Sequence, residues 1–412
     1  MKGLNRQEGN LFIDNVSLEE IAKKFGTPAY VYSASKFKEN LNKYLSAVGE
    51  NDKICYSVKS NSNIHILSML SELGSGFDVV SGNELKKCLE AGAKPENIVF
   101  SGVGKTKEEI NLALKENIFS INIESGEELD RIIGITKELG IKANCIIRVN
   151  PDISAKSHPY IQTGLRTSKF GVLKEAVEPL AKKASQAGVV NIIGIASHIG
   201  SQIFDKNLIL ENLNLLIELT NQLTDLGHQI SYLDLGGGLG IRYKEEEEIL
   251  PNQIIKQVLS ILRPLKLNLI LEPGRTISGN TGVLICKVEY LKKTSELNFA
   301  IIDSGMNDLL RPSLYHAWHH ISVVEDNTED KLPYKVVGPV CESGDTFGEG
   351  RMLNINENSI LAIHDTGAYG QVMSSNYNSR LRPPEILVEE SEIKIIRRRE
   401  TFDDLLIQEK DV

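Results

Sequence analysis

The stretch "GFDVVSGNELKKCLEAGAKPENIVFSGVGKTKEEINLALKENIFSINI" at residues 76–123 decides the fold class. In it, short apolar runs alternate with segments that have the length and apolar periodicity of helices. The same alternation extends from Pro28 to about Gly274, with eight candidate strands. About eight β/α repeats are typical of a (β/α)₈ barrel. A doubly wound open sheet is the alternative, and the number of repeats favours the barrel.

The eight candidate strands carry polar residues or glycine at or near their carboxyl ends. The strands are "ICYSV" (54–58), "FDVVS" (77–81), "NIVFS" (97–101), "FSINI" (119–123), "NCIIRVN" (144–150), "NIIGIASHI" (191–199), "SYLDLGG" (231–237) and "LNLILEPG" (267–274). The residues at or near their ends include Lys59, Asp78, Arg148, His198, Gly236 and Glu272. In a barrel these ends meet at one mouth, where active sites lie.

The pattern changes after Arg275. Runs such as "GVLICKVEYLKK" (282–293), "YKVVGPV" (334–340) and "EILVEESEIKIIRR" (385–398) indicate strands separated by turns, with little helix. This pattern is typical of a mostly β domain. We therefore predict a barrel at residues 31–276 and a β domain at 277–412, to which residues 1–30 contribute through "LFIDNVS" (11–17).

Composition excludes several classes of protein. A chain of 412 residues is long enough for about two domains. The net charge of −9 gives no basic footprint for nucleic acid or an anionic membrane surface. No apolar run is long enough to cross a bilayer, and the polar first ten residues contain no secretory signal. Five scattered cysteines without CxxC spacing argue for a reducing compartment and against a disulfide framework or a zinc site. We expect a cytoplasmic protein without a metal.

Two glycine-rich stretches imitate nucleotide-binding motifs and fail on spacing. In "SGVGKTKEE" (101–109), a phosphate loop would require glycine where Val99 stands. We expect a strand-to-helix loop capped by Thr106 instead. In "DLGGGLGI" (234–241), the third glycine of the dinucleotide fingerprint is replaced by Ile241. Consecutive glycines at a strand end still allow backbone amides to approach an anion, although a flexible turn is an equal alternative.

Several single residues have both a functional and an ordinary reading. Glu272, in "LEPGRT" (271–276), is a candidate partner for a cationic ring nitrogen, although a surface pair with Arg275 is the simpler reading. A lone histidine such as His198 is more often structural, and Cys341 in "GPVCESGD" (338–345) reads first as an inert buried cysteine. "HAWHH" (316–320) has no acidic or cysteine partner at a familiar metal-ligand spacing, so we expect solvated histidines there.

Taken together, these residues describe one chemistry. A lysine amine forms a Schiff base with an aldehyde cofactor. Pyridoxal phosphate also needs a carboxylate near its ring nitrogen, backbone amides for its phosphate and a flat group against its ring. Lys59, Glu272, Gly236 to Gly238 and His198 supply one of each at the predicted mouth of the barrel.

The sequence resembles the fold type III, alanine-racemase-type decarboxylases that use pyridoxal phosphate, and among them those acting on meso-diaminopimelate. The segments that carry the resemblance are "YSVKSN", "GFDVVSGNE", "SGVGKTKEE", "RVNPDI", "YIQTGLRTSKFG", "SHIGSQI", "LDLGGGLGI", "EPGR", "DSGMNDLLRPSLYHA", "GPVCESGD" and "DTGAYGQVMSSNYN". They follow one another in the family's order from residue 56 to 378, which is nearly the whole chain.

The resemblance implies a barrel followed by a β domain and a pyridoxal phosphate site. Lys59 would hold the cofactor, His198 would stack on its ring, and Glu272 would face the ring nitrogen. Asp78 would lie near the lysine, and Tyr369 near the phosphate. The remaining cofactor contacts would come from Ser201, Gly236, Gly237, Gly238, Pro273, Gly274 and Arg275.

The resemblance also implies a substrate site shared between the subunits of a homodimer. Arg275 and Arg311 would bind the carboxylate on the non-reacting centre of meso-diaminopimelate, because an arginine fork can hold both oxygens. Tyr315 would assist them and Glu342 would take the ammonium, while Tyr369 or Tyr377 would close the pocket. Cys341 would come from the partner subunit and protonate the carbanion left after CO₂ departs.

Three rival functions are less consistent with the residues. A decarboxylase of ornithine, arginine or carboxynorspermidine would need an acid for a distal cation instead of two arginines. A racemase would need a catalytic tyrosine in place of the Cys341 loop. A non-catalytic binding homologue would be expected to lose Lys59 or the cofactor-holding residues, and Lys59 and Glu272 are both present.

Overall fold

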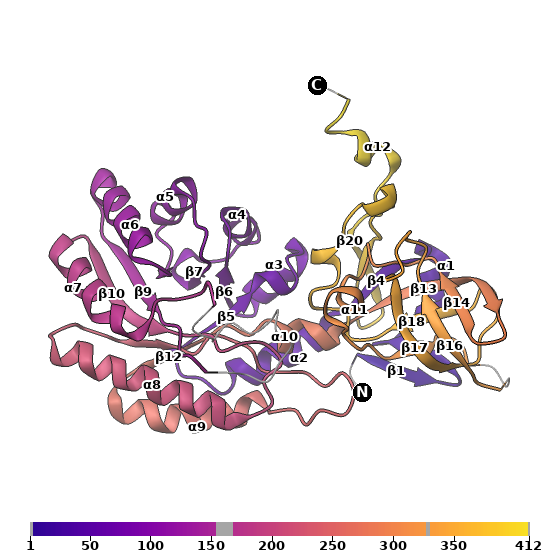
Figure 1. Cartoon of the computed structure of the whole chain (residues 1–412), viewed down its shortest axis with the longest axis horizontal. Coiled ribbons are helices and arrows are strands. Elements are labelled where there is room, and N and C mark those ends of the chain that lie inside the picture. The colour runs from indigo at the N-terminus through magenta and orange to yellow at the C-terminus, as the bar shows by residue number, and fades with distance from the viewer. Residues whose placement is uncertain (1–2, 154–167, 327–329, 411–412) are drawn as a thin grey trace. The chain divides into compact units, whose positions relative to one another are not determined.

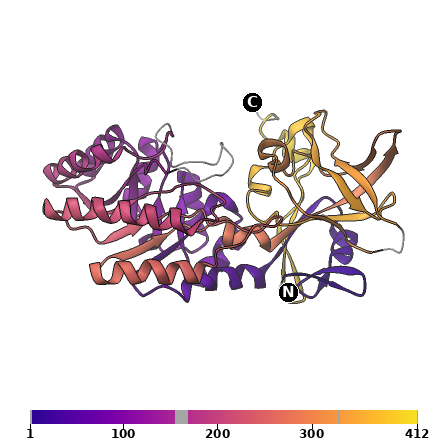
Figure 2. The same cartoon turned by 60° about the horizontal axis from the view of Figure 1, so that its bottom comes forward.

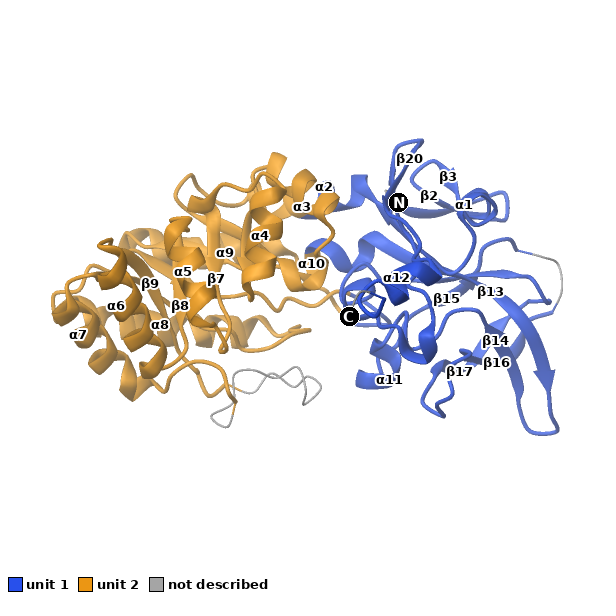
Figure 3. Ribbon diagram, turned by 90° about the horizontal axis from the view of Figure 1, so that it is seen from above, with its two compact units in different colours: residues 1–40, 242–246, 277–412 blue, residues 41–241, 247–276 orange. Residues whose placement is uncertain are grey.

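The computed structural model describes residues 3–153, 168–326 and 330–410, and its contacts divide the chain into two compact units (Figure 3). Unit 1 comprises residues 1–40, 242–246 and 277–412, and unit 2 comprises residues 41–241 and 247–276. Most of the segment "YIQTGLRTSKFG", up to residue 167, lies outside the described residues.

Unit 2 is a closed barrel of eight parallel strands. The strands are β5 (Lys53–Ser57), β6 (Gly76–Val79), β7 (Ile98–Phe100), β8 (Ser120–Ile123), β9 (Ala143–Arg148), β10 (Val190–Ala196), β11 (Tyr232–Asp234) and β12 (Asn268–Leu271). They pair in chain order, and β12 closes the ring on β5 through Ile270 opposite Lys53 and Leu271 opposite Ile54. The predicted barrel is confirmed, and each of the eight predicted strands overlaps one strand of the barrel.

Helices follow the barrel strands and form an outer layer (Figures 1 and 2). They are α3 (Ile64–Glu72), α4 (Gly82–Glu90), α5 (Lys107–Lys115), α6 (Gly126–Leu139), α7 (Val177–Ala187), α8 (Lys206–Asp225) and α9 (Pro251–Leu262). Hydroxyl side chains cap three of them, because Ser81, Thr106 and Ser125 each accept a hydrogen bond from the backbone N–H three residues ahead. The Gly-Lys-Thr sequence is therefore the predicted cap of α5, where Thr106 and Glu109 form a capping box.

Unit 1 is built around a nine-stranded sheet. Its main path runs β17 (Thr346–Leu353), β16 (Leu332–Val337), β14 (Asn298–Ile302), β13 (Gly282–Lys293), β4 (Ala29–Ser33), β19 (Glu385–Glu389) and β20 (Glu392–Arg397). Two further strands, β15 (Ile321–Val323) and β18 (Ile360–Ile363), pair with each other, and β18 also pairs with β13. The mostly β character predicted after Arg275 is confirmed, and the α-helices in the described part of this stretch are the short α10 (Arg275–Ser278), α11 (Arg311–Tyr315) and α12 (Phe402–Leu406).

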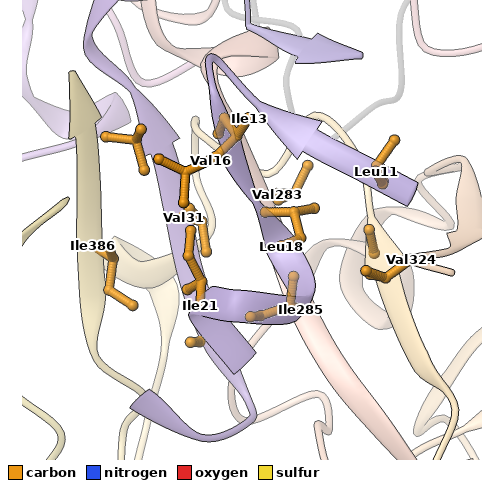
Figure 4. Packing of buried hydrophobic residues seen from close by; sticks show 13 residues of the cluster. Leu11, Ile13, Val16, Leu18, Ile21, Val31, Val283, Ile285, Val324 and Ile386 are labelled. Atoms are coloured by element: carbon orange, nitrogen blue, oxygen red, sulfur yellow. The ribbon is translucent and has the colours of Figure 1, made fainter. Parts of the chain in front are cut away.

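The amino-terminal segment joins unit 1 in two ways. The strand β4 lies in the main sheet, between β13 and β19. The strands β1 (Leu4–Gln7), β2 (Asn10–Ile13) and β3 (Val16–Ser17) form a separate small sheet, and α1 (Leu18–Phe25) follows it. Figure 4 shows how Leu11, Ile13 and Val16 pack with apolar residues of the main sheet and α1 in one buried cluster.

The unit boundaries differ from the predicted ranges at two places. Residues 31–40 group with unit 1, since β4 ends at Ser33 within the main sheet and only the second part of α2 (Ala34–Leu45) belongs to unit 2. Residues 242–246 also group with unit 1, although they lie between β11 and α9 in the chain. Strand pairing between distant segments produces the first difference, which the β/α rhythm does not encode.

Short 3₁₀ turns complete the secondary structure. They are η1 (Val58–Ser60), η2 (Pro95–Asn97), η4 (Lys174–Ala176), η5 (Arg263–Leu265), η6 (Gly279–Thr281), η7 (Gln371–Met373) and η8 (Tyr377–Ser379). Within the described ranges, no helix is both long enough and apolar enough to span a membrane.

Candidate active site

The carboxyl ends of the barrel strands enclose a group of buried polar side chains. Such a group is costly inside a barrel unless its members satisfy one another. The members are Asp78, Ser101, Asn122, Glu124, Arg148, Asp234 and Glu272, each with at most 9 % of its surface exposed. Their position at the mouth of unit 2 is the position that the sequence predicts for an active site.

Lys59 reaches this group from η1, the turn that directly follows β5. Its Nζ lies 2.9 Å from Oδ2 of the fully buried Asp78, while 40 % of the lysine side chain stays exposed. Ser57 Oγ lies 2.9 Å from the same carboxylate oxygen. Burial opposes the charge on Asp78, but the Lys59 ammonium and the hydrogen bonds outweigh burial and lower the pKa of the carboxyl. Asp78 therefore holds an accessible primary amine in a fixed place.

Glu272 directly follows β12, and its pKa is shifted in the opposite direction from that of Asp78. Burial, together with the nearby carboxylates of Asp234 and Asp78, raises the pKa of Glu272 well above its ordinary value. Ser101 Oγ donates to Glu272 Oε1 over 3.3 Å, and Asn122 Nδ2 donates to Ser101 Oγ over 3.0 Å. Burial thus favours the protonated form of Glu272, and a short polar chain across the barrel holds its carboxyl group.

Asp234 is a carboxyl neighbour of Glu272, and the sequence analysis assigned it no role. Its Oδ1 accepts from the Gly236 amide over 2.8 Å. Burial raises the pKa of Asp234 to about 6. Asp234 and Glu272 are therefore two neighbouring carboxyl groups, and the protonation of each depends on the other. The only sequence signal was an acid at the end of an apolar strand, directly before the glycines.

His198 presents a neutral ring beside the glycine loop, which is the segment Gly236 to Gly238. Its Nδ1 accepts a hydrogen bond of 3.2 Å from the Gly237 amide. Burial, together with the positive charges of Arg148 and Lys59, lowers the pKa of His198 to about 3. An uncharged imidazole at this mouth is suited to stacking against a flat ring and not to pairing with an anion.

The three glycines are required by close packing. A Cβ on Gly237 would lie 2.1 Å from the Glu272 carbonyl oxygen, and one on Gly238 would lie 2.2 Å from the Gly200 carbonyl oxygen. Gly236 and Gly238 also have φ angles of 65° and 101°, which side chains disfavour. The loop is therefore a shaped turn, and the alternative of a merely flexible turn does not hold. Two of its amides serve Asp234 and His198.

The turn after Glu272 contributes a cation and a hydroxyl. Arg275 is buried at the start of α10, and its Nη2 donates to Ser201 Oγ over 3.2 Å. The Pro273 carbonyl accepts from the Ser57 amide over 3.1 Å, which ties this turn to the end of β5. A Cβ on Gly274 would lie 3.1 Å from the Ser57 Cβ, so glycine is favoured where the two strand ends meet.

Unit 1 carries the remaining candidate residues, and hydrogen bonds fix its loop at 338–345. The Asp345 carboxylate accepts from the Met306 and Val340 amides, each over 2.7 Å. Cys341 is exposed on this loop, and its amide donates to Asn378 Oδ1 over 3.1 Å. The adjacent Glu342 is also exposed and accepts from the Tyr377 hydroxyl over 2.5 Å.

Cys341 differs from the other four cysteines, so its first reading as an inert buried residue is wrong. Burial raises the pKa of Cys55, Cys88, Cys145 and Cys286 above the ordinary thiol value. These four side chains are buried, whereas Cys341 is exposed and is the cysteine open to chemistry.

The other candidates in unit 1 are more enclosed. Arg311 is buried, whereas Tyr315 and Tyr369 are half-buried, and Tyr369 has a φ angle of 55°. His319 was expected to be solvated, but only 1 % of its surface is exposed and it contacts Arg311. Among the described residues, no group of three or more His, Cys, Asp or Glu side chains has the arrangement of a metal site.

Comparison with known proteins identifies the relatives of the chain. Residues 34–279 match the family described as pyridoxal-dependent decarboxylase, pyridoxal binding domain. The chain is 43% identical to a diaminopimelate decarboxylase of Pseudomonas aeruginosa, over 98% of each chain. It is 45% identical to one of Aquifex aeolicus, over 99% of this chain and 98% of that one.

A solved structure extends the likeness to three dimensions. The crystal structure of diaminopimelate decarboxylase from Helicobacter pylori complexed with L-lysine is 42% identical and superposes with a TM-score of 0.91. The match covers 95% of this chain and 99% of that chain.

The raised pKa of Asp234 predicts a distinctive pH dependence of stability. Because the pKa of Asp234 rises from its ordinary 3.8 to about 6 on folding, its contribution to stability is present below about pH 4 and is lost as pH rises past 6. Asp234→Asn removes this loss and keeps an acceptor for the Gly236 amide. We expect the free energy of unfolding of the variant, relative to the unmodified protein, to rise between pH 4.5 and 8 by about 2 kcal/mol.

Urea unfolding of the cofactor-free protein at a series of pH values measures this difference. Asp225→Asn, at an exposed position at the end of α8, is the matched control and should give a difference that does not vary with pH. A pH-independent difference for Asp234→Asn would show that folding does not raise the pKa of Asp234.

Proposed function

The chain belongs to the diaminopimelate decarboxylase family of pyridoxal-dependent decarboxylases, and we propose from this premise how its own residues perform the reaction. The reaction is removal of CO₂ from meso-2,6-diaminopimelate to give L-lysine, the last step of lysine biosynthesis. The observation that carries the proposal is the set at the barrel mouth, in which Asp78 holds the Lys59 amine and Ser101 holds the Glu272 carboxyl group.

The cofactor is pyridoxal 5′-phosphate, and the residues at the mouth of unit 2 fit its chemical groups. Lys59 offers a primary amine for the aldehyde carbon, and His198 offers a flat neutral ring. Arg275 and Ser201, 3.2 Å apart, offer a cation and a hydroxyl for the phosphate. We propose that the glycine loop, Pro273 and Gly274 shape the phosphate side of the site. When bound, the cofactor supplies an electron sink for the electron pair of the bond to CO₂.

Glu272 has the property that this chemistry requires of it. A ring nitrogen withdraws electrons best when it is protonated, and the raised pKa of Glu272 favours a carboxyl group that carries a proton. Asp234 raises the pKa of Glu272, while Ser101 fixes one of the carboxyl oxygens. We therefore assign to Glu272 the proton at the ring nitrogen, and to Asp78 the placement of Lys59 Nζ.

We assign substrate recognition to residues whose chemistry matches the non-reacting end of diaminopimelate. That end carries a carboxylate and an ammonium. Arg275 and Arg311 are proposed for the carboxylate, with Tyr315 assisting, and Glu342 for the ammonium. Tyr377 donates a hydrogen bond to Glu342, which orients this acid, and Tyr369 or Tyr377 is proposed to close the pocket.

We propose that the enzyme is a cytoplasmic homodimer with shared active sites. Cys341 and Glu342 are exposed on this chain, as residues that serve a partner's site must be before assembly. In that arrangement the Cys341 thiol of one subunit gives its proton to the reacting carbon in the site built around the other subunit's Lys59.

Substrate choice is tested by CO₂ release from meso-diaminopimelate beside ornithine and arginine. We expect release from diaminopimelate alone, because two arginines match a distal carboxylate and repel a distal cation. Release from ornithine or arginine without release from diaminopimelate would overturn the assignment. A protein that fails to bind pyridoxal phosphate would overturn the use of this cofactor.

Glu272→Gln tests the proton at the ring nitrogen. The amide keeps a hydrogen bond to Ser101 but cannot hold an acidic proton. We expect cofactor affinity to stay within a few-fold while turnover falls by about 100-fold or more. Glu247→Gln, in the exposed acidic run after β11, is the matched control and should keep full turnover. Unchanged turnover in Glu272→Gln would remove Glu272 from the mechanism.

Mixing two inactive variants tests the shared site. A dimer of one Lys59→Ala chain and one Cys341→Ala chain contains one site with both residues intact. Random reassociation should therefore restore about a quarter of the activity of the unmodified enzyme. Absence of recovery, with mixed dimers demonstrated by native mass spectrometry, would place Cys341 and Lys59 of one site in the same subunit.

A further inference from the structure

Arg311, at the start of α11, is held by two side chains from other parts of unit 1. Its Nη1 lies 2.8 Å from His319 Nε2. Its guanidinium carbon lies 4.7 Å from the ring centroid of Tyr243, which comes from the short segment 242–246. Only 5 % of the arginine is exposed, so both contacts are made away from bulk water, where they are stronger.

His319 is itself fixed by the neighbouring sheet. Its Nδ1 lies 2.8 Å from the His364 carbonyl oxygen, at the end of β18, and its ring meets the Tyr243 ring edge to face at 5.3 Å. The His364 amide donates to the His320 carbonyl over 2.9 Å, which ties the segment carrying His319 to the same strand end. The position of His319 is therefore set by β18.

The partners of His319 decide which ring nitrogen carries the hydrogen. A carbonyl oxygen only accepts, so Nδ1 donates to it, and Arg311 only donates, so Nε2 accepts from it. The imidazole is therefore in its neutral form with the hydrogen on Nδ1. It orients the guanidinium without cancelling its positive charge, unlike a carboxylate partner.

One hydrogen bond and one aromatic ring that the guanidinium contacts together restrict the plane of that guanidinium. The five N–H donors of arginine lie in that plane, and recognition of a carboxylate through two parallel hydrogen bonds depends on its direction. The sheet strand β18 thus determines, through His319, how Arg311 meets an anion.

We propose that His319 is a positioning residue that sets the plane of Arg311 for the carboxylate on the non-reacting centre of the substrate. The proposal rests on the proposed function, in which Arg311 binds that carboxylate. Specificity for a substrate with a second carboxylate then depends on a neutral histidine that does not touch the substrate.

Three substitutions of His319 separate its two hydrogen bonds. His319→Gln keeps an acceptor near the place of Nε2, His319→Asn keeps a donor near the place of Nδ1, and His319→Leu keeps neither. In the holoenzyme we expect KM for diaminopimelate to rise by about tenfold or more in the Leu and Asn variants, with kcat within about threefold. The Gln variant should stay within about threefold of the unmodified KM. His316→Gln, at the exposed end of α11, is the matched control.

Two inhibitors test whether the substitutions of His319 weaken binding through the carboxylate of the ligand. L-lysine carries the carboxylate of the non-reacting centre, and 1,5-diaminopentane is the same molecule without it. We expect His319→Leu to raise the inhibition constant of L-lysine by about tenfold and to leave that of 1,5-diaminopentane unchanged. In an Arg311→Met background, His319→Leu should weaken L-lysine binding no further, because its effect passes through Arg311.

The outcomes distinguish this inference from the proposed function. CO₂ release from diaminopimelate by the unmodified enzyme reports on the proposed function alone. Equal weakening of both inhibitors, unchanged L-lysine binding or an additive loss in the Arg311→Met background would overturn the role of His319. If His319→Leu does not fold, as judged by its thermal unfolding, equal KM values for the Gln and Asn variants would overturn it.

Discussion

The ion pair between Lys59 and Asp78 is the contact on which the rest of the site depends. Asp78 is fully buried, and a buried carboxylate is tolerated only when a positive charge and hydrogen bonds compensate for its lost hydration. Lys59 supplies that charge from a turn at the strand end, and in doing so its amine is held at the mouth of the barrel. The 2.9 Å contact that compensates the buried charge of Asp78 is therefore also the contact that places the Lys59 amine for chemistry.

Two other buried acids at the barrel mouth, Asp234 and Glu272, have pKa values shifted in the opposite direction from that of Asp78. Burial and neighbouring carboxylates raise the pKa of Asp234 and Glu272, whereas the Lys59 ammonium and hydrogen bonds outweigh burial at Asp78 and lower its pKa. The pKa values of acids at one barrel mouth are thus shifted in opposite directions. The proposed function uses this difference, because it assigns to Asp78 the placement of the amine and to Glu272 the proton at the ring nitrogen.

The barrel and the residues at its mouth could be predicted because they depend on local sequence. Buried parallel strands have apolar sequences, so the strands and the polar residues at their ends, Lys59, His198 and Glu272, could be recognised directly in the sequence. Asp234 and His319 were missed because their roles come from partners far away in the chain, Glu272 and Arg311. Long-range strand pairing likewise moved residues 31–40 out of the predicted barrel. The glycine loop was predicted only in part. The sequence indicated its place at a strand end, but only the structure shows how closely it packs against Glu272.

The central claim is that Lys59 is the amine that bears the cofactor, and one measurement tests it directly. Borohydride reduction of the enzyme with bound pyridoxal phosphate fixes the cofactor irreversibly to its lysine, and peptide mass spectrometry then locates it. We expect the added mass on Lys59, within "YSVKSN". Modification of a different lysine, with Lys59 unmodified, would show that Lys59 does not bear the cofactor.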